Sequence, residues 1–89
     1  MNNTIFAPRA WKEYLEWQNE DKKTLKRINL LIKDIQRSPF DGLGKPEPLK
    51  GDLSGSWSRE IDEKNRMIYR ILYNGDVDII QCKGHYDDK

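Results

Sequence analysis

The sequence is poor in the residues that form disulfides or bind metal ions in small proteins, with one cysteine and one histidine among 89 residues. Cys82 cannot form an intramolecular disulfide, and together with His85 it is too little for a structural zinc site. No apolar run approaches the roughly 20 residues that span a bilayer, and residues 1–4 do not open a signal or transit peptide. These absences exclude a disulfide-rich secreted protein, a zinc finger and a membrane protein. They predict a soluble cytoplasmic protein with no metal and no cofactor.

Charge of one sign is lacking as well, because 16 Lys and Arg residues face 15 Asp and Glu residues, for a formal net charge of +1. Bulk charge therefore does not indicate a nucleic-acid-binding protein, and the distribution of charge has to decide. Three tryptophans and four tyrosines supply material for a core, so the chain is not disordered. Its length predicts a single domain over residues 1–89, without internal repeats.

The first part of the chain has the apolar spacing of two helices. Pro8 suits a helix start, and the residues after it predict a helix over residues 8–18. Cap-type residues at 19–21 precede a second apolar stripe, which predicts a longer helix that ends near Arg37. Four basic side chains fall within about 60° of each other on the flank of that stripe. We call Lys22, Lys26, Lys33 and Arg37 the basic ridge.

The second half of the chain has the signals of a loop followed by strands. Residues 41–56 are rich in glycine and proline and predict a long loop of the kind that often carries function. Asn74-Gly75 predicts a two-residue hairpin turn, and Ile5-Phe6 is a candidate edge strand. β-Branched and aromatic runs predict three strands, at residues 57–61, 66–73 and 77–83. The prediction is an α+β fold of order βααβββ, with two N-terminal helices packed on an antiparallel sheet.

A two-residue turn would also decide which side chains share a face of the sheet. Tyr73 would lie opposite Asp76, and the helix-facing side would hold Met67, Tyr69, Ile71, Ile80 and Cys82. The other side would hold Arg66, Arg70, Gln81, Lys83 and His85. A three-residue bulged turn would shift this pairing. With the two-residue turn, basic and titratable side chains gather on the face away from the core.

The groups needed for metal-free cleavage of RNA are present. The reaction requires a base for the 2′-hydroxyl, an acid for the departing 5′-oxygen, and cations for the phosphate. His85 titrates near neutral pH, and Glu47 is held between two prolines in extended backbone. Taken singly, each is better explained as an ordinary surface residue. As a set, Glu47 and His85 with either Arg66 or Arg59 can fill the three roles.

Several strings of residues carry a resemblance that covers nearly the whole chain. They include Gly44-Lys45-Pro46-Glu47-Pro48-Leu49-Lys50, Leu53-Ser54-Gly55-x-Trp57-Ser58-Arg59, Arg66-x-x-Tyr69 and the His85-Tyr86 end. These strings resemble the YoeB (Txe) toxins of the RelE/ParE superfamily. The resemblance implies a toxin of a type II toxin-antitoxin pair with the RelE-like, microbial-ribonuclease-like fold. Such a toxin cleaves mRNA in the A site of the 70S ribosome and is silenced by a YefM/Axe-type antitoxin, and a homodimer is left open.

By position, the resemblance also implies roles for individual residues. The catalytic set falls on Glu47, Arg66, His85 and the supporting tyrosine Tyr86, and basic residues that bind or support the RNA phosphate fall on Lys50 and Arg59. The basic ridge would dock on the ribosome, although a merely solvated helix flank explains it equally well. Two departures stand out. The chain continues past Tyr86 through Asp87-Asp88-Lys89, and Glu60 stands where relatives can carry a second arginine, which weakens the local attraction for phosphate.

Two other classes of function compete with the nuclease. One is a non-enzymatic, ParE-like toxin that binds a topoisomerase, and the other is a plain RNA-binding module, which would bind free RNA tightly without cleaving it. A pure binder has no need for Glu47, Arg66 and His85-Tyr86 together.

Overall fold

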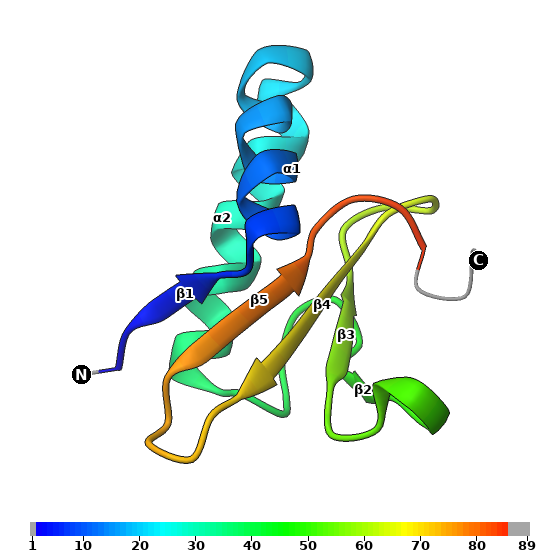
Figure 1. Ribbon diagram of the computed structural model, residues 1–89. Helices are drawn as coiled ribbons and strands as arrows, with labels where there is room; N and C mark the ends of the chain where they lie inside the picture. Colours follow the sequence, from blue (N-terminus) through cyan, green and yellow to red (C-terminus); the bar gives the residue numbers. More distant parts are fainter. Residues whose placement is uncertain (1, 86–89) are drawn as a thin grey trace.

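The computed structural model describes residues 2–85, so the predicted site residue Tyr86 lies outside the described residues. Two helices follow a short first strand, and the remaining strands occupy the second half of the chain (Figure 1). The elements are β1 (Thr4–Phe6), α1 (Pro8–Glu20), α2 (Lys22–Arg37), β2 (Glu47–Pro48), the 3-10 helix η1 (Gly51–Leu53), β3 (Trp57–Glu60), β4 (Arg66–Ile71) and β5 (Val77–Gln81). The predicted α+β fold is confirmed.

The sheet is larger than predicted and is mixed rather than antiparallel. Its strand order is β1-β5-β4-β3-β2, and β1 runs parallel to β5 while the other neighbours are antiparallel. β2 and η1 lie inside residues 41–56, which were expected to be loop. A strand of two residues is too short to leave a pattern that sequence reasoning can read.

The helices start and stop close to the predicted residues. Pro8 occupies the first turn of α1, where its missing N–H is not needed. The Asp21 carboxylate caps α2 by accepting hydrogen bonds from the backbone N–H groups of Lys23 (3.1 Å) and Thr24 (3.2 Å). The two helices lie side by side and rise from one face of the sheet (Figure 1). None of the helices in residues 2–85 is long and apolar enough to cross a membrane.

The core lies between the helices and that face of the sheet. Residues of both helices and of strands β4 and β5 bury their side chains there, among them Ala10, Trp17, Ile28, Leu31, Ile35, Met67, Tyr69, Val77, Ile79 and Cys82. Because neighbours along a strand point to opposite faces, residues next to Met67 and Tyr69 on β4 must face away from the helices. The second face of the sheet, away from the helices, therefore begins at Arg66, Ile68 and Arg70.

The predicted two-residue hairpin turn is wrong. The backbone N–H of Leu72 donates to the carbonyl of Asp76 (2.8 Å), and that of Gly75 donates to Leu72 (2.8 Å), which leaves a three-residue loop. Gly75 has a φ of 91°, the left-handed conformation that closes such a bulged turn. Tyr73 is thus a loop residue and does not pair with Asp76.

The longer loop shifts the pairing of β4 with β5 by one residue. Tyr69 lies opposite Ile79, so Val77 and Ile79 take the helix-facing positions, and Ile80 is only half-buried outside the core. A register shift between Ile68 and Tyr69 then brings Ile68 opposite Gln81, which returns Cys82 to the core as predicted. The register shift between Ile68 and Tyr69 therefore cancels the one-residue shift that the bulged turn introduces.

Candidate functional site

One row of side chains crosses four strands on the second face of the sheet. Glu47 of β2 lies opposite Ser58 of β3, Ser58 opposite Ile68 of β4, and Ile68 opposite Gln81 of β5. Directly opposed residues point to the same face. Glu47 therefore projects from the face that the helices leave uncovered.

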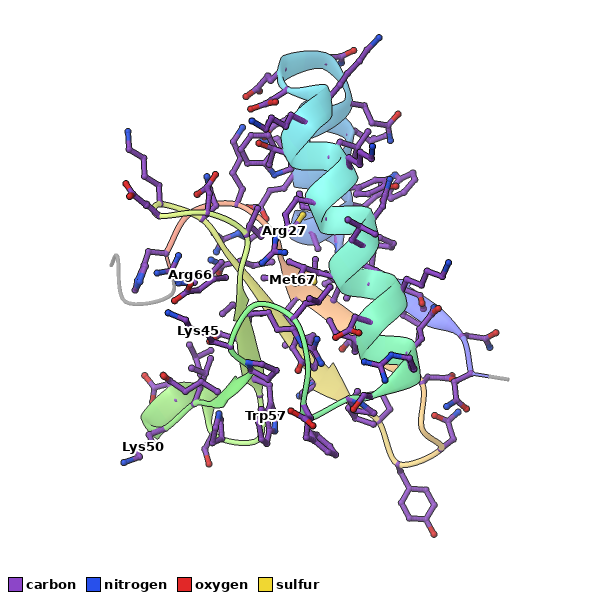
Figure 2. All side chains as sticks on the ribbon, turned by 180° about the vertical axis from the view of Figure 1, so that it is seen from behind. Arg27, Lys45, Lys50, Trp57, Arg66 and Met67 are labelled. Atoms are coloured by element: carbon purple, nitrogen blue, oxygen red, sulfur yellow. The ribbon has the colours of Figure 1, made fainter. Side chains whose placement is uncertain are left out.

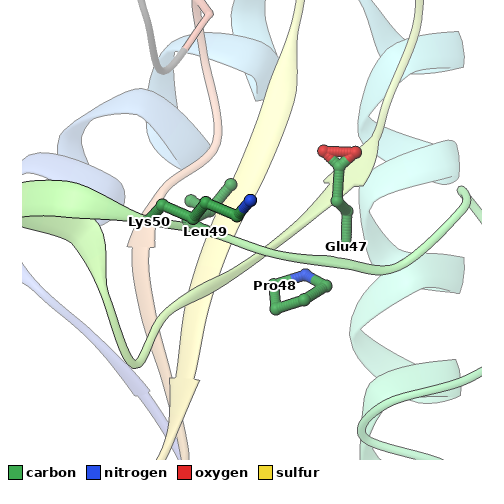
Figure 3. A pocket seen from close by; sticks show the side chains of 4 residues that line it. All are labelled: Glu47, Pro48, Leu49 and Lys50. Atoms are coloured by element: carbon green, nitrogen blue, oxygen red, sulfur yellow. The ribbon is translucent and has the colours of Figure 1, made fainter.

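Glu47 stands on a small strand that the sequence makes stiff. Pro46 and Pro48 restrict the backbone on both sides, and the Glu47 side chain is exposed. Next to it lies a hollow of about 480 Å³ lined by Glu47, Pro48, Leu49 and Lys50 (Figure 3). The buried Leu49 anchors this segment, and its N–H donates to the Ser56 carbonyl (2.9 Å). The structure thus brings Lys50, itself exposed, to the same hollow as Glu47.

Arg66 lies on the same face of the sheet, two residues before Ile68 on β4. It is opposite Glu60 of β3, and its Nη2 is 3.9 Å from a carboxylate oxygen of that residue. Its Nη1 donates to the carbonyls of Asn65 (3.1 Å) and Asp62. The Arg66 side chain is 16% exposed, so the guanidinium is held in place while one edge stays open to solvent.

The segment after β5 brings His85 near Arg66, because this segment runs along the start of β4. The backbone N–H of Arg66 donates to the Gly84 carbonyl (2.9 Å), and the N–H of Gly84 donates to the side-chain oxygen of Asn65 (2.8 Å). Figure 1 shows this segment, which follows β5, passing the turn between β3 and β4. The half-buried His85 follows directly after Gly84.

Helix α1 holds the segment that leads to His85. Trp17 donates its indole N–H to the Cys82 carbonyl (2.8 Å), and the buried Glu13 accepts the Cys82 N–H (2.8 Å). The Lys83 ammonium pairs with Glu16 and Glu20, each at 3.1 Å. Lys83 was predicted on the second face, but these carboxylates draw it to the helix side.

Arg59 does not lie at the surface of this site. Its side chain is fully buried on the helix-facing side, and all five of its N–H donors are used. The acceptors are the Tyr69 hydroxyl (3.2 Å), the Asp34 carboxylate (2.6 Å) and the carbonyls of Leu43 (3.1 Å), Ser38 (2.6 Å) and Asp41 (3.0 Å). In this structure no donor of Arg59 is left for the RNA phosphate to which the resemblance assigns it.

Arg59 instead ties the loop that follows α2 to the sheet. Hydrogen bonds from Arg37, from the Leu43 N–H and from Arg59 hold the pKa of Asp34 well below its ordinary value. Burial raises the pKa of Tyr69, whose hydroxyl donates to the Pro39 carbonyl (2.6 Å). This network fixes the loop that leads from α2 to β2, and so it fixes the position of Glu47.

Sequence reasoning missed Asp34 and Tyr69 as members of this network. One signal was available, since two glycines at 42 and 44 indicate close approach of the backbone. A Cβ on Gly42 would lie 2.1 Å from an Asp34 oxygen, and one on Gly44 would lie 3.1 Å from the Glu60 backbone.

The basic ridge is exposed along α2, as predicted, and lies on a different side of the molecule from Glu47. Its four members are all solvent-exposed, and Arg37 also pairs with Asp34 (2.8 Å). α2 packs on the face of the sheet opposite to the one that carries Glu47 and Arg66. The structure thus places Glu47 and Arg66 on one face of the sheet, with Lys50 at the hollow beside Glu47 and His85 directly after the residue bonded to Arg66. It keeps apart from them the basic ridge of Lys22, Lys26, Lys33 and Arg37.

Comparisons with known proteins give a consistent family. Residues 6–86 match the family model described as the YoeB-like toxin of bacterial type II toxin-antitoxin systems. A toxin YoeB of Synechocystis is 57% identical over 81 residues, which cover 91% of this chain and 93% of the relative.

Two solved structures from Staphylococcus aureus are similar over almost their full length. A YoeB-YefM complex contains a chain with a TM-score of 0.87 and 40% identity, covering 97% of this chain and 99% of that one. A YoeB dimer matches with a TM-score of 0.87 and 41% identity, covering 96% and 98%.

Proposed function

The chain belongs to the YoeB family of toxins of bacterial type II toxin-antitoxin systems, and on that premise we propose that it is a ribosome-dependent endoribonuclease that cleaves mRNA in the ribosomal A site. One observation carries the proposal. Glu47 and Arg66 project from the same face of the sheet, on neighbouring rows, and the chain turns so that His85 follows the residue bonded to Arg66. A carboxylate, a guanidinium and an imidazole are the groups that metal-free RNA cleavage needs.

The spacing of these groups suits a single phosphodiester. β2 and β4 are two strand spacings apart, and Arg66 is two residues along β4 from the row of Glu47, so their Cα atoms are roughly 12 Å apart. Both side chains stand on the same face of the sheet. An RNA phosphate placed there can meet a base on one side and a cation on the other.

The reaction then follows from the chemistry of each group. Glu47 takes the proton of the 2′-hydroxyl, and the 2′-oxygen forms a bond to phosphorus. Arg66 stabilises the charge that builds on the phosphate oxygens. The bond from phosphorus to the 5′-oxygen breaks, and His85 gives that oxygen a proton. The products are a 2′,3′-cyclic phosphate and a 5′-hydroxyl, formed without metal or cofactor, and we assign Tyr86 a supporting role next to His85. Lys50 adds positive charge at the hollow beside Glu47.

The basic ridge supplies a surface for the ribosome. A near-neutral chain binds free RNA weakly, so its substrate has to be presented to it. Lys22, Lys26, Lys33 and Arg37 are exposed along one flank of α2 and are free of the catalytic face, which suits contacts with the backbone of ribosomal RNA. We propose that 70S ribosomes in the cytoplasm bring the mRNA to Glu47 while the ridge holds the toxin.

The partners follow from the family. The S. aureus relatives form a YoeB-YefM complex and a YoeB dimer. We propose that this chain likewise binds a YefM/Axe-type antitoxin and can form a homodimer. An acidic, partly disordered antitoxin segment that folds over the face of Arg66 and His85 would neutralise the cations meant for RNA.

The proposal is tested by incubating the protein with translating ribosomes and mapping the mRNA by primer extension. Cleavage in the A-site codon that disappears when ribosomes are omitted, with a cyclic phosphate at the new 3′ end, is the expected result. Growth inhibition without cleavage would favour a non-enzymatic toxin that acts on a topoisomerase. Tight, salt-sensitive binding of free RNA without cleavage would favour a plain RNA-binding module.

A further inference from the structure

Glu60 lies at the end of β3, with Arg66 on the strand to one side and the segment that carries Lys45 on the other. On one side, its carboxylate is 3.9 Å from Nη2 of Arg66, the residue directly opposite it on β4. On the other side, the register of β2 with β3 pairs Glu47 with Ser58 and Pro48 with Trp57. Beyond these pairs the register shifts by one residue, because the Glu60 N–H donates to the Gly44 carbonyl (2.7 Å). Gly44 therefore lies opposite Glu60, and Lys45 is the next residue along the chain.

The backbone of Glu60 is fixed at both of its polar groups. Besides the bond to Gly44, its carbonyl accepts a hydrogen bond from Nη2 of Arg27 on α2 (3.0 Å). Because the main chain is held, the Glu60 side chain starts from a fixed position beside Arg66. A carboxylate and a phosphate accept the same kind of hydrogen bond, so they compete for the same donors.

Lys45 is placed by an unusual backbone conformation. Its φ of 53° is the only positive φ of a non-glycine residue among residues 2–85. Such conformations are sparsely populated for residues with a Cβ and concentrate at functional sites. Figure 2 shows Lys45 and Arg66 on the side of the sheet away from the helices, at the same end of β3. A lysine at a φ that glycine adopts more easily is consistent with a functional position.

Among the described residues, the two terminal nitrogens of the Arg66 guanidinium differ in how tightly they are held. Nη1 is engaged by the carbonyls of Asp62 and Asn65, whereas Nη2 faces the Glu60 carboxylate at a distance longer than a hydrogen bond. The contact between Glu60 and Arg66 is therefore weak, and a phosphate with its stronger negative charge can displace the carboxylate.

We propose that Lys45 and Arg66 form a two-sided clamp for one phosphate group of the RNA, and that the Glu60 carboxylate occupies this clamp until the phosphate displaces it. The inference deepens the proposed function and rests on it for the identity of the ligand. It makes Lys45 a further phosphate-binding residue and Glu60 the residue that limits the affinity of the site.

The test measures binding of a short 2′-O-methyl RNA oligonucleotide, which cannot be cleaved. Binding is followed by NMR through the side-chain N–H of Arg66, at several salt concentrations. Glu60→Gln should bind several-fold more tightly, and its salt dependence should steepen by about 0.7, the slope per phosphate contact in single strands. Lys45→Gln should bind several-fold more weakly, with a slope that is shallower by about the same amount.

Matched controls separate the clamp from bulk charge and from folding. Glu63→Gln and Lys64→Gln change the same charges on exposed residues of the turn between β3 and β4, and both should bind like the wild type. Lys45→Gly removes the ammonium but relaxes the backbone, so it should melt no lower than the wild type and still bind as weakly as Lys45→Gln. Wild-type binding by Glu60→Gln, or full binding by Lys45→Gly, would overturn the inference.

Cleavage assays on ribosomes distinguish this inference from the proposed function. Glu60→Gln should lower KM for ribosome-bound mRNA several-fold, because a carboxylate no longer competes with the phosphate for Arg66. If the wild type cleaves on ribosomes while neither Glu60→Gln nor Lys45→Gln changes oligonucleotide binding, the clamp alone is wrong. If the binding changes appear as expected while the wild type does not cleave, the clamp stands and the nuclease assignment is wrong.

Discussion

Replacing Arg59 by lysine should destabilise the protein severely, although the charge is conserved. The guanidinium has five N–H donors and uses all of them, whereas an ammonium has three and cannot span acceptors that lie on different segments. At least two part-buried acceptors, among them the carbonyls of Ser38 and Asp41, would lose their donor. At roughly 1–2 kcal/mol for each, the free energy of unfolding should fall by about 2–4 kcal/mol.

The effect is measured by urea unfolding and by thermal melting. In a domain of this size, about 2–4 kcal/mol corresponds to a drop in Tm of roughly 10–30 °C. Arg37→Lys is the matched control, because Arg37 contacts the same Asp34 but is 69% exposed, and it should cost less than about 1 kcal/mol. If Arg59→Lys unfolds within 1 kcal/mol of the wild type and instead raises KM for ribosome-bound mRNA, then Arg59 contacts phosphate and the reasoning is refuted.

Three other predictions concern stability and docking. Because hydrogen bonds hold the pKa of Asp34 below its ordinary value of 3.8, its share of the stability is complete above about pH 4 and is lost as the pH falls toward the folded-state pKa. In urea unfolding between pH 5 and pH 2, the free energy of unfolding should therefore fall less with acid in Asp34→Asn than in the wild type. An equal fall in the two proteins would contradict this. Gly42→Ala should destabilise more than Gly51→Ala, because both have positive φ but only the first places a Cβ 2.1 Å from an Asp34 oxygen. Equal melting temperatures of these two variants would contradict the close contact. Charge reversal at Lys22 and Lys26 should weaken ribosome binding, most clearly as the salt dependence of the dissociation constant, while the cleavage rate at saturating ribosomes recovers. Normal binding with slow cleavage would place the basic ridge in the active site instead.

Much of the fold was readable because the signals are local. The apolar spacing and the cap at Asp21 predict both helices, and β-branched runs predict the three long strands. β2 was missed because two residues carry no period, and it forms only because Glu47 and Pro48 find an edge on β3. The hairpin loop was misjudged because Asn74-Gly75 suits both a two-residue turn and the longer bulged turn that forms.

In the candidate site, too, the sequence revealed residues that are marked by their local sequence and missed those that are placed by long-range contacts. Glu47 between two prolines and the lone His85 were visible in the sequence, and the structure brings Arg66 next to the segment that ends in His85. The burial of Arg59 was not visible, because it depends on carbonyls that come from a loop 16 to 21 residues away. The position of Lys45 near Glu60 likewise depends on the pairing of Gly44 with Glu60.

The most direct test of the account is the cleavage rate of Glu47→Ala and His85→Ala on mRNA in saturating translating ribosomes. Glu47 is exposed and His85 half-buried, both outside the core, so both variants should fold and melt close to the wild type. If Glu47 is the base and His85 the acid, each variant should bind ribosomes normally and cleave about 10²- to 10⁴-fold more slowly. Folded variants that cleave at the wild-type rate would contradict the assignment of both residues.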